Sequence, residues 1–539
     1  MGNAEQCPSY PNPRTVSPEQ LFKSPEVVEA LAAIDALFTN ASASLPGFIA
    51  TVVFDQQTMF AKGYGYKNIT NKTQGPPTRT SLVRIASITK TFTTTLMYVL
   101  QERSLISLED NVKQYLPTFS MQLAKNITLR ELASHTAGIP REMPYPCASF
   151  TVQGTSRPGR ASSSLSCNET AILDILQTKP VMSPTHRRFH YSNLGMALLG
   201  RALAHVPGNA LTAVAGGSTY EDLVRHYITA PLQMNNATFQ YNATTKSRSA
   251  VGVSLDGTVV DMPFSKSCGF GAPAGCLWAS AQDMELFLKF LFRIDPLPSQ
   301  SKNSKNSKNS KNSKNSKNSK NSKNSKNSMH GGHHDPLRSG HHDPLRSGTI
   351  AEMLAPSVLL RNGYEAVGSP FEMQYIANKY WTKGKQGELP GYRSSLTLIE
   401  DLKLGIFTSA LQTDTTSNSV WTIPALRILA PAVDKALTRL QPAAQLPQNY
   451  EMYVGQYYGN MSIRTSGNRL IFAMGSLGAE DELDLIAHPL NYHLRAQNKQ
   501  AIGCRWLDDG ANNEIVEFIV VKEQVVALEF MGSRYDRLK

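Results

Sequence analysis

A serine and a lysine three residues apart offer the clearest chemistry in this chain. Ser87 and Lys90 lie in the string VRIASITKTFTTTLMYVLQE, whose pattern predicts a helix that begins near the serine. Residues three apart share one face of a helix, so the lysine nitrogen can reach the serine oxygen and help to remove its proton. The pair predicts a nucleophilic serine activated by lysine. S-x-x-K also occurs on ordinary solvated helix faces, so other segments have to decide.

Two later segments carry the groups that such a serine needs. RRFHYSNLGMALLG contains Tyr191 and Asn193, a phenol and an amide just before an apolar helix. A tyrosine beside an ammonium can act as general base and acid, and an asparagine can hold a substrate amide or the lysine. TKGKQGELPGYRSSLTLIEDLKLGIFTSA contains Lys385 and Gly387 before two predicted strands, where glycine permits close approach and lysine adds positive charge near an oxyanion. The alternatives are a core aromatic for Tyr191 and a solvated strand residue for Lys385.

With these three segments, the chain resembles the serine beta-lactamase and penicillin-binding-protein superfamily, most closely its class C, D,D-peptidase and esterase branch. The second element is Y-x-N rather than S-D-N. The third matches the family string K-T-G-x-x-G-G-F as KQGELPGY, with Gln386 in place of Thr and Pro390 in place of Gly. A register that starts at Lys383 does not align the following Gly-Tyr pair. ITLRELASHTAGIPRE and GAPAGCLWASAQDMELFLKFL are similar to family strings as well, and the resemblance covers residues 20–435.

The resemblance implies a role for each matching residue. Ser87 would attack an ester, amide or lactam carbonyl, and Lys90 and Tyr191 would share the proton and pass it to the leaving group. The backbone N–H groups of Ser87 and Glu388, the residue after the Lys-Gln-Gly element, would hold the oxyanion. Asn193, Lys385 and Gly387 would position the substrate. The mechanism implies neither a metal nor a cofactor, and Gln386 leads us to expect that activated short-chain aryl esters react faster than penicillins.

Composition and charge exclude two other classes of protein. The chain has 539 residues, of which 41% are apolar and 18% charged, as in soluble globular proteins. Its net charge of +12 includes +9 from residues 299–348, which leaves +3 and no basic surface for nucleic acid. No run of apolar residues is long enough to span a membrane. We expect a small-molecule or peptide substrate, and the sequence leaves the oligomeric state open.

Residues 299–348 form a polar insert with internal repeats. Nine Ser-Lys-Asn triplets are followed by two copies of HHDPLRSG. A segment without an apolar pattern cannot bury enough surface to fold, so we expect it to be disordered and dispensable. A metal-binding tract is the alternative, because five of the twelve histidines lie here, but the repeat provides no fixed scaffold.

Cysteines and glycosylation sequons favour a secretory or extracellular location. The chain has six cysteines, for which Cys147–Cys167 and Cys268–Cys276 are attractive local pairs, although six buried thiols are the alternative. Sequons begin at eight asparagines: Asn40, Asn68, Asn71, Asn126, Asn168, Asn236, Asn242 and Asn460. The first twenty residues contain no signal peptide, and Gln6 does not fit a myristoylation signal. Either the chain is cytosolic or its natural leader is missing, and the sequons favour the second.

The order of predicted elements indicates an α/β fold. Helical spacing over residues 25–40 is followed by strands at 47–55 and 58–66, a long helical middle and strands again from Tyr392. We expect an N-terminal extension (1–19), a beta-lactamase-like sandwich of an antiparallel sheet with a helical region (20–435, interrupted by 299–348) and a C-terminal all-β domain (445–539). A small barrel is one form that this last domain could take, and we assign it no catalytic role.

Three functions are compatible with these residues. The first is a serine hydrolase that works through an acyl-enzyme. The second is an acyltransferase, in which an alcohol or amine replaces water. The third is a binding protein that retained the fold, and the intact Ser87, Lys90, Tyr191 and Lys385 argue against it.

Overall fold

The fold is taken from a computed structural model of the chain. It describes residues 16–144, 147, 168–185, 188–208, 219–260, 269–293, 344–360, 362–412 and 421–440, together with eight strands between residues 451 and 537.

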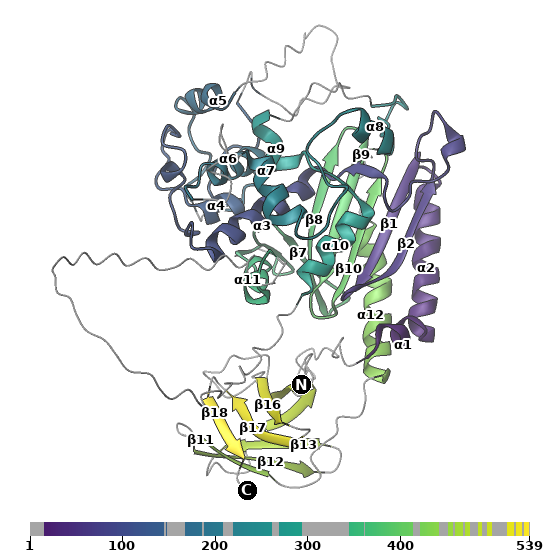
Figure 1. Ribbon diagram of the computed structural model, residues 1–539, viewed down its shortest axis with the longest axis vertical. Coiled ribbons are helices and arrows are strands. Elements are labelled where there is room, and N and C mark those ends of the chain that lie inside the picture. The colour runs from purple at the N-terminus through teal and green to yellow at the C-terminus, as the bar shows by residue number, and fades with distance from the viewer. Residues whose placement is uncertain are drawn as a thin grey trace, which may run out of the picture.

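An eight-stranded sheet, antiparallel between all neighbours, forms the frame of the larger part (Figure 1). The N-terminal hairpin of β1 and β2 extends one edge of the C-terminal strands, because β1 pairs with β10 as well as with β2. The order is β2 (Gln57–Gly65), β1 (Gly47–Phe54), β10 (Leu404–Ala410), β9 (Tyr392–Ile399), β8 (Tyr380–Leu389), β7 (Glu372–Ile376), β6 (Glu365–Val367) and β5 (Val358–Leu359).

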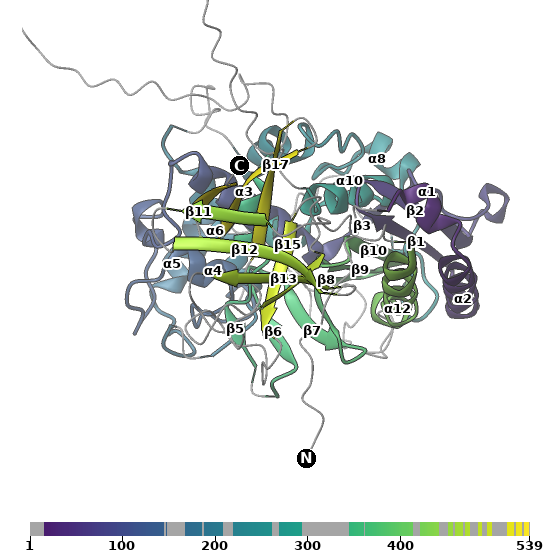
Figure 2. The same cartoon turned by 90° about the horizontal axis from the view of Figure 1, so that it is seen from below.

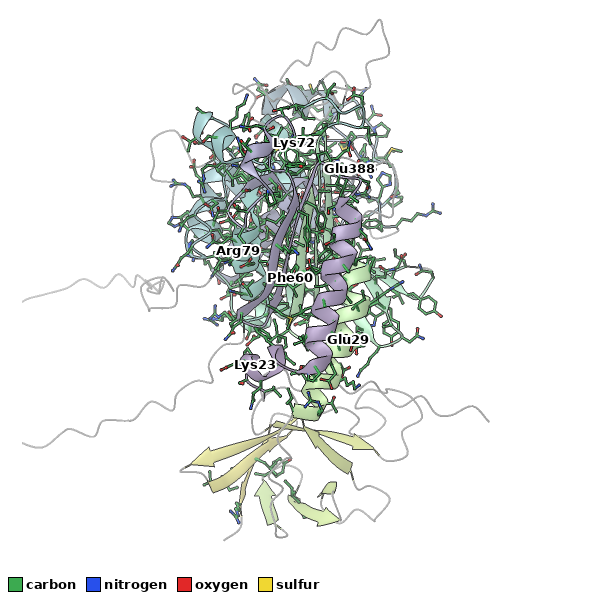
Figure 3. All side chains as sticks on the ribbon, turned by 90° about the vertical axis from the view of Figure 1, so that its right-hand side faces the viewer. Lys23, Glu29, Phe60, Lys72, Arg79 and Glu388 are labelled. Carbon is green, nitrogen blue, oxygen red and sulfur yellow. The ribbon has the colours of Figure 1, made fainter. Side chains whose placement is uncertain are left out.

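Three helices cover one face of this sheet. They are α1 (Pro18–Phe22), α2 (Pro25–Ser42) and α12 (Thr422–Leu440). A proline at the first turn starts α2, and its apolar residues recur at helical spacing, so that Phe38 packs against Phe48 of β1 with ring centres 5.5 Å apart. Figure 3 shows Phe60 of β2 beside α2, and its ring centre lies 6.2 Å from that of Phe38. This apolar layer holds the N-terminal and C-terminal helices of the larger part together.

The other face packs against a helical region around α3 (Thr89–Glu102). Residues Thr89 to Leu100 are all buried, and threonines in the helix satisfy their hydroxyls by donating back to the preceding turn, as Thr91 does to the Ile88 carbonyl at 2.7 Å. The other helices of this layer are α4 (Leu129–Ala133), α5 (Glu169–Leu176), α6 (Asn193–Ala204), α7 (Tyr220–Val224), α8 (Ala243–Arg248), α9 (Ala272–Gly275), α10 (Ala281–Leu291) and α11 (Ser347–Met353).

Short elements complete the helical layer. The strand β3 (Leu82–Arg84), which comes shortly before α3, pairs with β4 (Trp278–Ser280) in a two-stranded sheet. The single turns are η1 (Lys72–Gln74), η2 (Ala86–Ile88), η3 (Val112–Gln114), the π-helical η4 (Arg225–Thr229) and η5 (Gly269–Gly271).

The C-terminal strands form a closed barrel of their own. Figure 1 draws them below the sheet, and Figure 2 looks onto them from that side. Pairing of β11 with β18 closes the ring, so no strand edge remains open. The strands are β11 (Glu451–Gly455), β12 (Gly459–Ser466), β13 (Arg469–Met474), β14 (Leu483–Ala487), β15 (His493–Asn498), β16 (Ile515–Val521), β17 (Gln524–Phe530) and β18 (Ser533–Arg537).

The fold class expected from the sequence is confirmed. The predicted helix at 25–40 is α2, and the predicted strands at 47–55 and 58–66 are β1 and β2. In the described part of the chain, no helix has the length and apolar character needed to cross a membrane.

Two expected boundaries need correction. The last residues of the predicted insert are packed: Leu345 is buried, Arg293 Nη1 donates to its carbonyl at 2.9 Å, and α11 begins at Ser347. The single leucine of the second HHDPLRSG copy therefore anchors the chain, a contact that the polar composition of the repeat concealed. Val16, within the predicted N-terminal extension, is buried as well. Residues 299–343, including the five histidines, lie outside the described residues.

Of each predicted cysteine pair, the structure describes one cysteine. Cys147 and Cys276 are buried, and neither is a free thiol. Their predicted partners, Cys167 and Cys268, lie outside the described residues, so both pairings stay predictions.

Candidate active site

Ser87 lies in the single turn η2, which leads directly into α3. The residue before it, Ala86, has a φ of 49°, a left-handed conformation that L-residues other than glycine seldom adopt. This backbone is fixed from both sides, because Ile85 N–H donates to the Leu277 carbonyl and Ile88 N–H to that of Ile85, each at 3.2 Å. The strained turn therefore sets the position of the serine at the start of the helix.

Lys90 lies beneath Ser87 and is fully buried. Its Nζ donates to Ser87 Oγ at 3.0 Å, to Asn193 Oδ1 at 2.8 Å and to the Ala274 carbonyl at 2.5 Å, which uses all three N–H bonds of an ammonium. Burial lowers the pKa of Lys90, and the nearby Tyr191 opposes that shift. The spacing inferred from the sequence does bring the two side chains together.

Tyr191 comes two residues before α6 and points at the serine. Its hydroxyl donates to Ser87 Oγ at 2.9 Å. Lys385 Nζ lies 4.8 Å and Lys90 Nζ 5.0 Å from the centre of its ring. Burial raises the pKa of Tyr191, but Lys90 and Lys385 together lower it more, to about 8. The phenol can therefore exchange its proton near neutral pH.

The third element lies on β8, which passes close to η2. A Cβ on Gly387 would stand 2.2 Å from the Ile85 carbonyl oxygen and 2.8 Å from the Ser87 nitrogen, so only glycine fits there. Lys385 is buried two residues earlier on the strand, and the side chains of Gln386 and Glu388 are exposed. The close approach places the strand beside the Ser87 N–H.

These residues meet at a pocket of about 1090 Å³. Of the seven residues to which the sequence assigns a role in the reaction, six line it: Ser87, Tyr191, Asn193, Lys385, Gly387 and Glu388. Lys90 lies beneath Ser87, out of the pocket. Glu388, labelled in Figure 3, lies at the end of the sheet opposite α1. The volume is ample for a drug-sized substrate.

Three residues of the site were not singled out from the sequence. Glu142 accepts two hydrogen bonds from Asn193 Nδ2, at 2.8 and 3.0 Å, so both ends of that amide are occupied by protein groups. Glu372 of β7 accepts a hydrogen bond from Lys385 Nζ. The buried ring of His135 lies 4.6 Å from that of Tyr191.

His135 supports Tyr191 as a neutral ring. Its Nδ1 accepts a hydrogen bond from the Ser192 N–H at 3.2 Å, so its proton is on Nε2. Burial lowers the pKa of His135 well below its usual value, and Lys90 and Lys385 lower it further. The string ITLRELASHTAGIPRE, which is similar to family strings, contains both His135 and Glu142 and was the available signal. Glu372 lies in no such string.

Comparison with known proteins identifies the family of this chain. A family model described as Beta-lactamase matches residues 34–421. Beta-lactamase-like protein 2 of Dictyostelium discoideum is 28% identical, over 97% of this chain and 88% of its own.

Two solved structures share the fold at low sequence identity. The octameric penicillin-binding protein homologue from Pyrococcus abyssi matches with a TM-score of 0.56 and 18% identity, over 94% of this chain and 99% of that protein. A class C beta lactamase from Rhodobacter sphaeroides matches with a TM-score of 0.51 and 16% identity, over 76% and 98% of the two chains. The family model covers well over half of the sequence, and the resemblance drawn from the three motifs is thereby confirmed: this chain belongs to the beta-lactamase family.

Proposed function

We propose that this protein is a serine hydrolase that cleaves an ester, amide or lactam through an acyl-enzyme on Ser87. The observation that carries the proposal is the position of Ser87 Oγ, within hydrogen-bond reach of both Lys90 Nζ and the Tyr191 hydroxyl, in a pocket open to substrate. Intact groups for proton transfer are what a hydrolase needs and a binding protein does not.

The two groups beside Ser87 Oγ have different tasks in this mechanism. As Ser87 Oγ attacks the carbonyl carbon, its proton passes to deprotonated Tyr191, while Lys90 donates a hydrogen bond to Oγ. Lys90 is buried beneath the serine, so Tyr191, which lines the pocket, delivers the proton to the leaving group. The Ser87 and Glu388 N–H groups stabilise the oxyanion, and water then attacks the acyl-enzyme with Tyr191 as its base.

Short-chain aryl esters are the expected substrates for a first assay. An aryl leaving group departs with little protonation, so acylation asks only for the serine, a base and the oxyanion site. A lactam asks in addition for a cation that holds its carboxylate. Gln386 stands at the lining of the pocket where the family string has Thr, and we expect penicillins to acylate slowly.

Acyl transfer is the second candidate. The pocket volume of about 1090 Å³ favours it, because a small acyl group on Ser87 leaves space for an alcohol or amine beside it. Partition of the acyl-enzyme between water and added nucleophiles would separate the two reactions.

Covalent labelling tests the nucleophile. A mechanism-based serine probe should add one adduct to the wild type by intact mass and none to Ser87→Ala. Ser254→Ala is the matched control and should keep the adduct, since Ser254 lines the same pocket and its hydroxyl bonds to Asp256 and Thr258 rather than to a lysine of the described residues. Equal labelling of the wild type and Ser87→Ala would refute the proposal.

We also propose that the protein passes through a secretory pathway, with disulfide bonds and glycans. Five sequon asparagines are exposed: Asn40, Asn71, Asn126, Asn168 and Asn242. Asn236 differs, because its Nδ2 donates to Ser280 Oγ at 3.2 Å, and we expect it to stay unmodified. Protein from a secretory host should shift on glycosidase treatment and show few free thiols; no glycan and six free thiols would favour a cytosolic protein.

A further inference from the structure

The most buried cation of the pocket, Lys385, is paired with a carboxylate of the neighbouring strand. Its Nζ donates to Glu372 Oε1; the lysine side chain is 2% exposed and that of Glu372 40%. The register of the sheet creates this pair, since Glu372 of β7 lies opposite Gly384 of β8. Burial lowers the pKa of Lys385, but Glu372 and Tyr191 raise it more, so the ammonium is charged. Glu372 already balances that charge.

The other cations of the pocket wall have carboxylate partners too. The pairs are Arg141 Nε with Glu142 Oε1 at 3.2 Å and Arg393 Nη1 with Glu388 Oε2 at 3.9 Å. Asp256 and Glu365 also line the pocket, and within the described ranges neither has a basic partner within 4 Å. Among the described residues that line the pocket, carboxylates thus outnumber cations by two.

The Lys385–Glu372 pair flanks the side of the pocket where the leaving group departs. Lys385 Nζ lies 4.8 Å from the centre of the Tyr191 ring, and Tyr191 is the residue that protonates the leaving group in the proposed mechanism. An anionic substituent on the leaving group would have to compete with Glu372 for Lys385 and lose its water in a wall rich in carboxylates. A neutral or cationic substituent meets neither cost.

Resting on the proposed hydrolase activity, we propose that Glu372 makes the site selective by charge, so that it accepts esters or amides with a neutral or cationic leaving group and disfavours those with a carboxylate. The substrate class is then one without the carboxylate that lactams and peptide C-termini carry.

Three phenyl acetates that differ only in the meta substituent test this inference. The substituents are carboxylate, carboxamide and trimethylammonium, and each kcat/KM is divided by the rate of the same ester with hydroxide to remove intrinsic reactivity. We expect the wild type to cleave the carboxylate ester at least about tenfold more slowly than the carboxamide ester, the equivalent of about 1.4 kcal/mol. The trimethylammonium ester should be at least as fast as the carboxamide ester.

Two substitutions distinguish the effect of the Lys385–Glu372 pair on selectivity from the effect of the net charge of the pocket wall. Glu372→Gln frees the charge of Lys385 and should raise the carboxylate-to-carboxamide ratio by about tenfold. Glu365→Gln removes the same charge from the wall without touching Lys385, and should change the ratio by less than about threefold. Comparing esters within one variant cancels any change in the proton transfer by Tyr191.

The outcomes are distinct. A carboxylate ester cleaved as fast as the carboxamide ester by the wild type, or equal shifts in the two variants, would overturn the inference. If Glu372→Gln does not fold, the wild type still decides: raising salt from about 0.05 to 0.5 M should narrow the gap, because these carboxylates are partly exposed and screened. A difference in kcat/KM between the carboxylate and carboxamide esters that salt does not reduce would also overturn the inference. If the wild type cleaves all three esters no faster than Ser87→Ala does, the proposed hydrolase function itself is refuted.

Discussion

At the scale of single residues, the site is a balance of buried charges around one phenol. Tyr191 lies within about 5 Å of two ammonium groups and beside the neutral ring of His135. A second proton on His135 would add another cation to this cluster, in which the Arg141 guanidinium already lies 4.8 Å from the centre of the Tyr191 ring, and burial prevents it. Two lysines and a neutral histidine thus leave Tyr191 ready to lose its proton while Lys385 stays charged.

The pH dependence of the reaction follows from that environment. Burial raises the pKa of Tyr191, Lys90 and Lys385 lower it more, and the result is about 8. A general base works in its deprotonated form, so kcat/KM for an aryl ester should rise tenfold per pH unit below about 8 and level off above it. Tyr191→Phe should lose about 10²- to 10⁴-fold of kcat/KM together with this limb of the profile.

A tyrosine that does not line the pocket provides the control. Tyr364 is 67% exposed, and Tyr364→Phe should keep both the rate and the profile. A Tyr191→Phe variant that retains the wild-type pH profile would assign the titrating base to another group.

The site residues that could be predicted from the sequence are those that lie together in short motifs. Ser87 and Lys90 share one helical turn, and Tyr191 and Asn193 share the start of α6, so spacing alone places each pair. Glu372 could not be found in this way. It lies thirteen residues before Lys385, and only the pairing of β7 with β8 brings the two together.

At the scale of elements, the decisive contact is between the strand β8 and the turn η2. The strand runs past the turn so closely that a side chain at Gly387 would meet the Ile85 carbonyl and the Ser87 nitrogen. Ala86, in its left-handed conformation, is part of the same contact, because its Cβ would stand 3.0 Å from a Cβ on Gly387. The oxyanion site thus depends on two backbones touching.

A single methyl group should break this contact. Gly387→Ala would force β8 and η2 apart, and we expect kcat/KM to fall by at least about 10²-fold, the loss that follows removal of one oxyanion donor. Overpacking should also cost about 1–3 kcal/mol of unfolding free energy, measured by urea denaturation.

Gly348 of α11 is the matched position. A Cβ there has no heavy atom within 4 Å, and Gly348→Ala should leave activity intact and stability equal or slightly higher. Normal activity of Gly387→Ala would mean that the oxyanion is held elsewhere.

At the scale of the whole molecule, the chain leaves and re-enters its helical layer at one point. Arg293, just after α10, donates to the carbonyl of Leu345, just before α11. Composition identified the repeats between them but placed their end at Gly348, which includes the first five residues of the packed region. A repeat copy looks the same in sequence whether or not its leucine meets a core.

Two deletions that differ by five residues test this boundary. Removal of 299–343 should leave the melting temperature and ester turnover close to those of the wild type, because closure entropy changes slowly with loop length. Removal of 299–348 also deletes the buried Leu345 and the start of α11, and should cost about 3 kcal/mol of unfolding free energy. Wild-type stability of both variants would refute the anchor, and an equal loss of stability in both would show that the repeats themselves contribute.

The anchored ends have a consequence for inheritance. Nine identical Ser-Lys-Asn triplets in a row are what a short tandem repeat of DNA would encode, and such repeats lengthen and shorten when the replicating strands slip. Because Arg293 and Leu345 fix both ends of the segment at one place, a change of a fifth in its length alters the closure free energy by only about 0.2 kcal/mol. Alleles with different numbers of triplets should therefore encode the same active site, and selection for enzyme activity would not act on the number of triplets.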